Sequence, residues 1–72
     1  MYNVYSLTDG MVDRERSFDS LEEAAYYYAD LVRDERDMRD TVPQYVETTV
    51  HLFDANESSM NMLAETCIGP RA

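Results

Sequence analysis

Residues 2–23 read YNVYSLTDGMVDRERSFDSLEE, and this stretch decides the fold because it encodes a β-hairpin followed by the start of a helix. Segment 2–7 is rich in aromatic and β-branched residues, which favour a strand, and segment 11–18 is expected to be extended again. Between them, Asp9 and Gly10 suit the two positive-φ positions of a type I′ turn. The sequence therefore predicts an antiparallel hairpin.

A two-residue turn fixes which residues of the hairpin lie opposite each other. Leu7 is expected to face Val12, and Tyr5 is expected to face Arg14 in a cation–π contact. Residues 13–16 alternate between acids and arginines, a pattern that protects an edge strand against unwanted pairing. The second strand is therefore expected at the edge of the sheet.

A long helix is predicted after the hairpin. Ser20 and Glu23 have the spacing of a capping box, in which the serine hydroxyl accepts from the amide three residues on. The helix is expected to run to Arg39 or Asp40, because Pro43 biases the residue before it toward an extended conformation. At about 100° per residue one stripe of the helix is expected to face the core. This stripe consists of Leu21, Ala24, Ala25, Tyr28, Leu31 and Val32.

The C-terminal part of the chain completes the sheet. Residues 45–53 alternate between apolar and polar side chains, as a half-buried strand does, and residues 54–59 are expected to form a polar turn. Residues 60–68 fit either a strand or a helix, and we predict a strand because it covers a bare sheet edge. The predicted class is α+β, a small antiparallel sheet with one covering helix in the order ββαββ, with ββαβα as the alternative. A chain this short is expected to form one domain over residues 1–72, with residues 69–72 as a flexible tail.

The composition limits the classes of function. Fifteen acidic side chains oppose six arginines and no lysine, which gives a formal net charge of −9. This charge disfavours direct binding to nucleic acid or membrane lipid and favours a basic surface of a protein or nucleoprotein complex. No signal sequence or membrane-spanning segment is recognised, so the expected location is the cytoplasm.

The sequence contains few side chains that could serve in catalysis. His51 and Cys67 are the only histidine and cysteine, and no glycine-rich phosphate loop is present. One thiol and one imidazole cannot supply the four ligands of a zinc site, and no segment fits an EF-hand loop. We expect neither an enzyme nor a bound cofactor or metal.

The outward side of the predicted helix carries the main candidate site. Four acids fall in a narrow sector opposite the core stripe, two tyrosines flank them, and one further acid lies at the margin. Such a face is either a solvated surface laced with weak ion pairs or an interface for a cationic partner. The candidate binding residues, which we name the acidic helix surface, are Glu22, Glu23, Tyr26, Tyr27, Asp30, Asp34 and Asp37.

In size, acidity, lack of catalytic groups and α+β pattern, the chain resembles the small phage-encoded anti-CRISPR and anti-restriction inhibitors, some of which mimic nucleic acid. The resemblance concerns general character and no shared motif. It implies an inhibitor of a nucleic-acid-binding effector complex, acting in the cytoplasm of the host cell. The alternative is a structural or homodimeric housekeeping domain from an organism whose proteins are generally acidic and adapted to salt.

Overall fold

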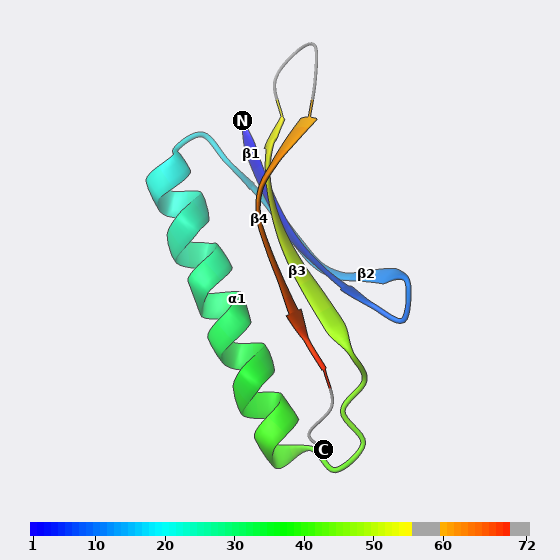
Figure 1. Ribbon diagram of the computed structural model, residues 1–72. Coiled ribbons are helices and arrows are strands. Elements are labelled where there is room, and N and C mark those ends of the chain that lie inside the picture. The colour runs from blue at the N-terminus through cyan, green and yellow to red at the C-terminus, as the bar shows by residue number, and fades with distance from the viewer. Residues whose placement is uncertain (56–59, 70–72) are drawn as a thin grey trace.

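The computed structural model describes residues 1–55 and 60–69 and shows a four-stranded antiparallel sheet covered on one face by a single helix (Figure 1). The chain order is ββαββ, which confirms the predicted α+β fold. The spatial order of the strands is β2-β1-β3-β4, so β2 is an edge strand, as predicted. The elements are β1 (Tyr2–Thr8), β2 (Met11–Phe18), α1 (Leu21–Thr41), β3 (Thr48–Ala55) and β4 (Met60–Ile68).

The β1–β2 hairpin has the predicted turn but not the predicted register. Asp9 and Gly10 have φ values of 54° and 77°, as a type I′ turn requires, and Leu7 lies opposite Val12. A bulge between Ser6 and Leu7 then shifts the pairing by one residue. The expected pairing of Tyr5 with Arg14 is therefore wrong: Tyr5 lies opposite Glu15, and Arg14 lies opposite Ser6.

The helix begins and ends close to the predicted residues. The Ser20 side chain accepts a hydrogen bond from the Glu23 amide (3.4 Å), and the Val42 amide donates to the carbonyl of Met38 after the last turn. Two members of the predicted core stripe, Leu21 and Ala25, are instead exposed.

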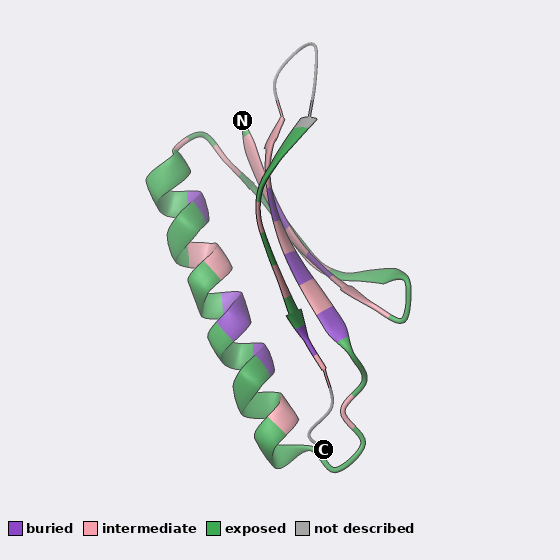
Figure 2. Cartoon of the chain, viewed as in Figure 1, coloured by how far each residue is buried: buried purple, intermediate pink, exposed green. Residues whose placement is uncertain are grey.

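The buried residues of α1 lie on the side toward the sheet (Figure 2), and all but one carboxylate are apolar. Glu35 is only 1% exposed and lies in the position where the helix passes over β1 and β2. Ionised side chains are rarely this buried unless they are paired. The buried apolar core consists of Val4, Ala24, Leu31, Val32, Val50, Leu52 and Ile68.

The last two strands settle the alternative left open by the sequence, because residues 60–68 form strand β4. Strand β3 covers residues 48–55, so it begins and ends later than the predicted segment 45–53. The predicted turn at 54–59 and the predicted tail at 69–72 lie mostly outside the described residues. In the described part of the chain, α1 covers one face of the sheet, and no helix or strand covers the other (Figure 1).

Candidate functional site

The acidic helix surface lies on the outward side of α1, which is exposed along its length (Figure 2). All five of its acids are exposed, and Tyr26 is 68% exposed. Tyr27 differs, because it is half-buried and its ring packs against Phe18 with a centroid distance of 5.3 Å. The structure thus presents six of the seven candidate residues to solvent and turns Tyr27 toward the hairpin.

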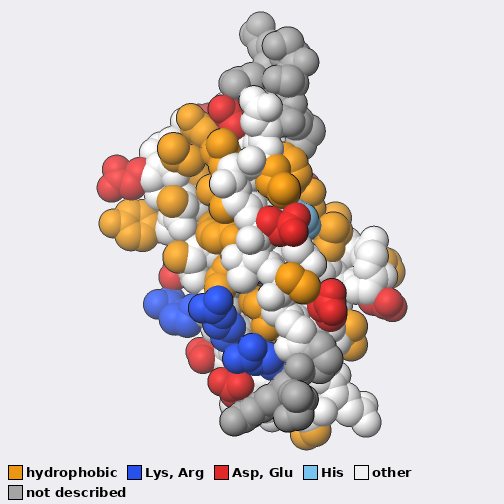
Figure 3. All heavy atoms as spheres, in the orientation of Figure 1, with side chains coloured by type: hydrophobic (Ala, Val, Ile, Leu, Met, Phe, Trp, Pro, Cys, Tyr) orange, Lys and Arg blue, Asp and Glu red, His pale blue; other side chains and the backbone are white. Residues whose placement is uncertain are grey.

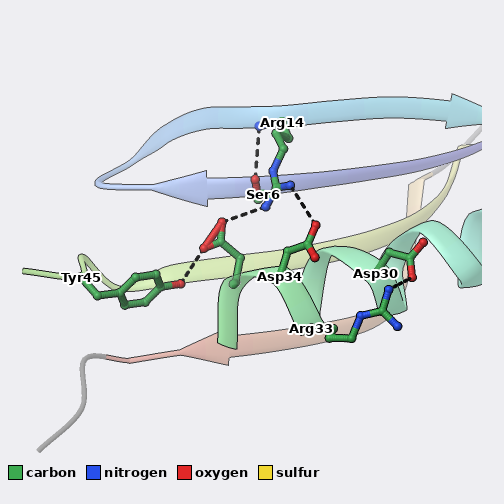
Figure 4. A network of polar contacts seen from close by, with 7 residues as sticks. Ser6, Arg14, Asp30, Arg33, Asp34 and Tyr45 are labelled. Atoms are coloured by element: carbon green, nitrogen blue, oxygen red, sulfur yellow. Dashed lines mark hydrogen bonds and ion pairs between the residues drawn. The ribbon is translucent and has the colours of Figure 1, made fainter. Parts of the chain in front are cut away.

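Two aspartates of this surface contact arginines (Figure 4). The Arg33 guanidinium donates to the Asp30 carboxylate at 2.7 Å, three residues apart within the helix. Arg14 on β2 lies 3.6 Å from the Asp34 carboxylate. Both aspartates are more than half exposed, and ion pairs of this kind stabilise a protein by less than about 1 kcal/mol. The carboxylates therefore stay accessible to a stronger cationic partner.

The arginines of α1 gather at the border of the acidic helix surface, on the side toward β4. In Figure 3 the blue side chains form one group over the C-terminal half of α1, beside β4. Arg33 and Arg36 line a groove of about 430 Å³ there, together with Thr66 and one acid of the acidic helix surface, Asp37. The arginines therefore border the acidic helix surface, since Asp37 lies in the same groove and Asp30 is paired with Arg33.

A buried polar network holds the hairpin against the helix (Figure 4). The two carboxylate oxygens of Glu35 accept from the Arg14 guanidinium at 3.1 Å and from the Tyr45 hydroxyl at 2.8 Å. The Ser6 hydroxyl accepts from the Arg14 amide at 3.2 Å. Burial, followed by the neighbouring Glu35 carboxylate, raises the pKa of Tyr45 and keeps its hydroxyl protonated as a donor. This network fixes the position of Arg14, and hence of Asp34, relative to the sheet.

The helix-free face of the sheet carries a second arrangement that the sequence analysis did not find. In the observed register Tyr5 lies opposite both Glu15 and His51, and His51 lies opposite Glu65. One row across all four strands therefore reads acid, tyrosine, histidine, acid. Together with Phe53 we name this group the open sheet face. The alternation over residues 45–53 could have placed His51 and Phe53 on one face of a strand. The pairing of Tyr5 with Glu15 could not be predicted, because it depends on the bulge in the hairpin.

The rings of the open sheet face are stacked. Tyr5 and Phe53 are parallel within 1° at a centroid distance of 5.6 Å, and His51 lies 5.0 Å from Tyr5. Burial raises the pKa of Tyr5, and the negative charges of Glu15 and Glu65 raise it further. The Nδ1 atom of His51 lies 3.4 Å from Glu65 but makes no hydrogen bond in the described structure.

The other reactive side chain, Cys67, contacts a carboxylate. Its exposed thiol donates to Glu47 at 3.3 Å, and this hydrogen bond raises the pKa of the thiol.

Within residues 1–55 and 60–69, no three histidine, cysteine or acidic side chains gather to hold a metal ion. No described helix is long and apolar enough to cross a membrane.

No family model, curated protein or solved structure matches this chain.

Proposed function

We propose that the protein is a small acidic binding protein, and not an enzyme, that occupies a basic surface of another protein or nucleoprotein complex. The observation that carries this proposal is the row of five exposed carboxylates along the outward side of α1. Asp30 and Asp34 make only exposed ion pairs, and Asp37 lies beside Arg33 and Arg36 in the groove toward β4. A one-signed row of carboxylates on a rigid helix attracts a cationic groove and speeds association with it.

The proposed partner is a nucleic-acid-binding effector complex, which the protein inhibits in the manner of the anti-CRISPR class. A basic groove that accepts a phosphate backbone also accepts a row of carboxylates at helical spacing. Asp30 and Asp37 are two turns apart, about 10 Å along the helix axis. The exposed ring of Tyr26 beside them adds apolar contact area at a small loss of side-chain entropy.

Charge reversal tests this proposal, and the structure decides which residues to reverse. Asp34 is left unchanged, because it contacts Arg14 of the buried network. The test variant is Asp30→Arg/Asp37→Arg, and the matched control is Asp13→Arg/Glu47→Arg, which changes the net charge equally at exposed residues outside the helix. Far-UV circular dichroism confirms that both variants fold.

The tagged wild-type protein is used to capture partners from lysate of its native host, with washes at low and high salt. The captured partner is then purified, and its affinity for each variant is measured by calorimetry. We expect the helix variant to bind at least about tenfold more weakly and the control within a few-fold of wild type, with binding that weakens as salt rises. Equal binding by both variants would overturn the proposal.

One observation favours the alternative of a homodimeric structural domain. Strand β4 is an edge strand with a single charged side chain, Glu65, and its Met62 and Leu63 are about half exposed. An edge without charge protection can pair with a second copy. Sedimentation velocity of wild type and Leu63→Lys separates the alternatives: a dimer that the lysine dissociates supports it, and a monomeric wild type excludes it.

A further inference from the structure

The open sheet face has the chemistry of a binding surface for cations. Its central residues, Tyr5, His51 and Phe53, are half-buried and stacked, and no described element lies over them. Its two flanking residues, Glu15 and Glu65, are exposed carboxylates on the two edge strands. Aromatic groups at the centre of an otherwise polar surface are typical of protein interfaces.

The described residues of the face include no arginine, and its one basic side chain, His51, contacts Glu65. The two arginines of the neighbouring strand β2 are used on the opposite face of the sheet, where Arg14 binds Glu35 and Arg16 lies over the Phe18 ring at 5.2 Å. The contact of Glu65 with His51 is not a hydrogen bond, so the Glu65 carboxylate keeps its capacity to accept from a partner. The row thus has a carboxylate at each end, Glu15 and Glu65, and aromatic rings between them.

This charge pattern selects the occupant. Nucleic acid and anionic lipid are repelled by the carboxylates. A second copy stacked face to face would bring four carboxylates together between two chains that each carry a charge of −9. An arginine side chain, in contrast, pairs with carboxylates through charge-assisted hydrogen bonds and stacks on aromatic rings.

The spacing of the row defines the segment further. Glu15 and Glu65 are three strand intervals apart, which corresponds to about 14 Å. In an extended peptide, two side chains four residues apart point the same way and are about 13 Å apart, with a third between them. We propose that the open sheet face binds an extended protein segment with arginines at positions i and i+4 and an apolar residue at i+2. This proposal does not depend on the role of the acidic helix surface.

The probe is the blocked peptide Arg-Ser-Leu-Ser-Arg, titrated into ¹⁵N-labelled protein and followed by NMR. Two control peptides accompany it: one with citrulline at both arginine positions, and one with the same composition in the order Arg-Arg-Leu-Ser-Ser. We expect saturable shifts centred on Tyr5, His51 and Phe53, and about tenfold weaker binding of each control peptide.

Two protein variants of equal net charge locate the site. Glu15→Gln/Glu65→Gln neutralises both carboxylates of the open sheet face, and Asp30→Asn/Asp37→Asn removes two of the five charges of the acidic helix surface. All four residues are exposed, and both replacements keep the side-chain shape. We expect about tenfold weaker binding for the first variant and a change below about twofold for the second. Equal losses in both variants, shifts centred on α1, equal binding of the citrulline peptide, or no saturable shift would each overturn the proposal. None of these results tests the capture experiment on the helix, so the two proposals can fail independently.

Discussion

Replacing Arg14 with methionine should strongly destabilise the protein, because Arg14 is the only cation bonded to the buried carboxylate of Glu35 in the described structure. Glu35 is 1% exposed, and its oxygens are held by the Arg14 guanidinium at 3.1 Å and the Tyr45 hydroxyl at 2.8 Å. In Arg14→Met the carboxylate stays buried with a single neutral donor. An uncompensated buried charge of this kind is costly.

The magnitude follows from how buried each partner is. Removing one member of a fully buried ion pair costs about 3 to 5 kcal/mol. Arg14 is 33% exposed, so water partly replaces it, and the Tyr45 bond remains; we therefore expect a loss of about 2 to 3 kcal/mol. A domain of this size has a free energy of unfolding of only about 4 to 11 kcal/mol. The corresponding fall in Tm is about 10 to 20 °C.

Urea denaturation followed by far-UV circular dichroism measures this loss, and the chain offers a matched control. Arg33 forms a shorter ion pair, 2.7 Å to Asp30, but both side chains are exposed, so Arg33→Met should cost less than about 0.5 kcal/mol. The double variant Arg14→Met/Glu35→Leu should recover most of the stability, because it removes the unpaired charge as well. Equal losses in the two single variants, or a double variant no more stable than Arg14→Met, would refute the reasoning.

Three further outcomes are expected. Burial raises the pKa of Tyr5 and Tyr45 above the ordinary value of 10.0. The stability that the neutral phenols provide is therefore fully present below about pH 10 and is lost as the pH rises through the raised pKa values. Phenolate absorbance and circular dichroism should change together in that pH range. Ser20→Ala should cost about 1 kcal/mol in urea denaturation because it removes the helix cap, and no loss would show that the 3.4 Å contact contributes nothing. Glu47→Gln should speed alkylation of Cys67 by iodoacetamide near pH 8, since it lowers the thiol pKa, whereas an unchanged rate would contradict the observed hydrogen bond.

The elements of the fold could be predicted from the sequence because each has a strong local signal. The Asp9-Gly10 turn and the Ser20 cap are determined by backbone geometry, and both lie where predicted. The strand over residues 60–68 had no decisive local signal, since its apolar residues fit two periods. The strand follows instead from a property of the whole sheet, because a three-stranded sheet would leave a long edge bare.

The positions around the helix could be predicted only in part. Exposure of Asp30 and Asp37 follows from the 100° rotation per residue, which any straight helix obeys. The same rotation places Glu35, four residues after Leu31, on the core stripe, but a carboxylate is expected outside the core until its partner is known. That partner, Arg14, is 21 residues away on another element. Local periodicity contains no information about such a contact.

The bulge between Ser6 and Leu7 connects the buried network to the open sheet face. Side chains alternate between the faces of a strand, so a shift of one residue moves every following side chain of β2 to the other face. In the regular register Tyr5 would lie opposite Arg14, and Glu15 would lie on the same face as Glu35. The bulge instead turns Arg14 toward Glu35 and leaves Glu15 beside Tyr5. A single extra residue in β2 thus neutralises the buried carboxylate on one face of the sheet and supplies the acid beside the aromatic row on the other. The same register therefore sets the stability of this fold and the charge of its uncovered face. Moving the bulge would change both properties together.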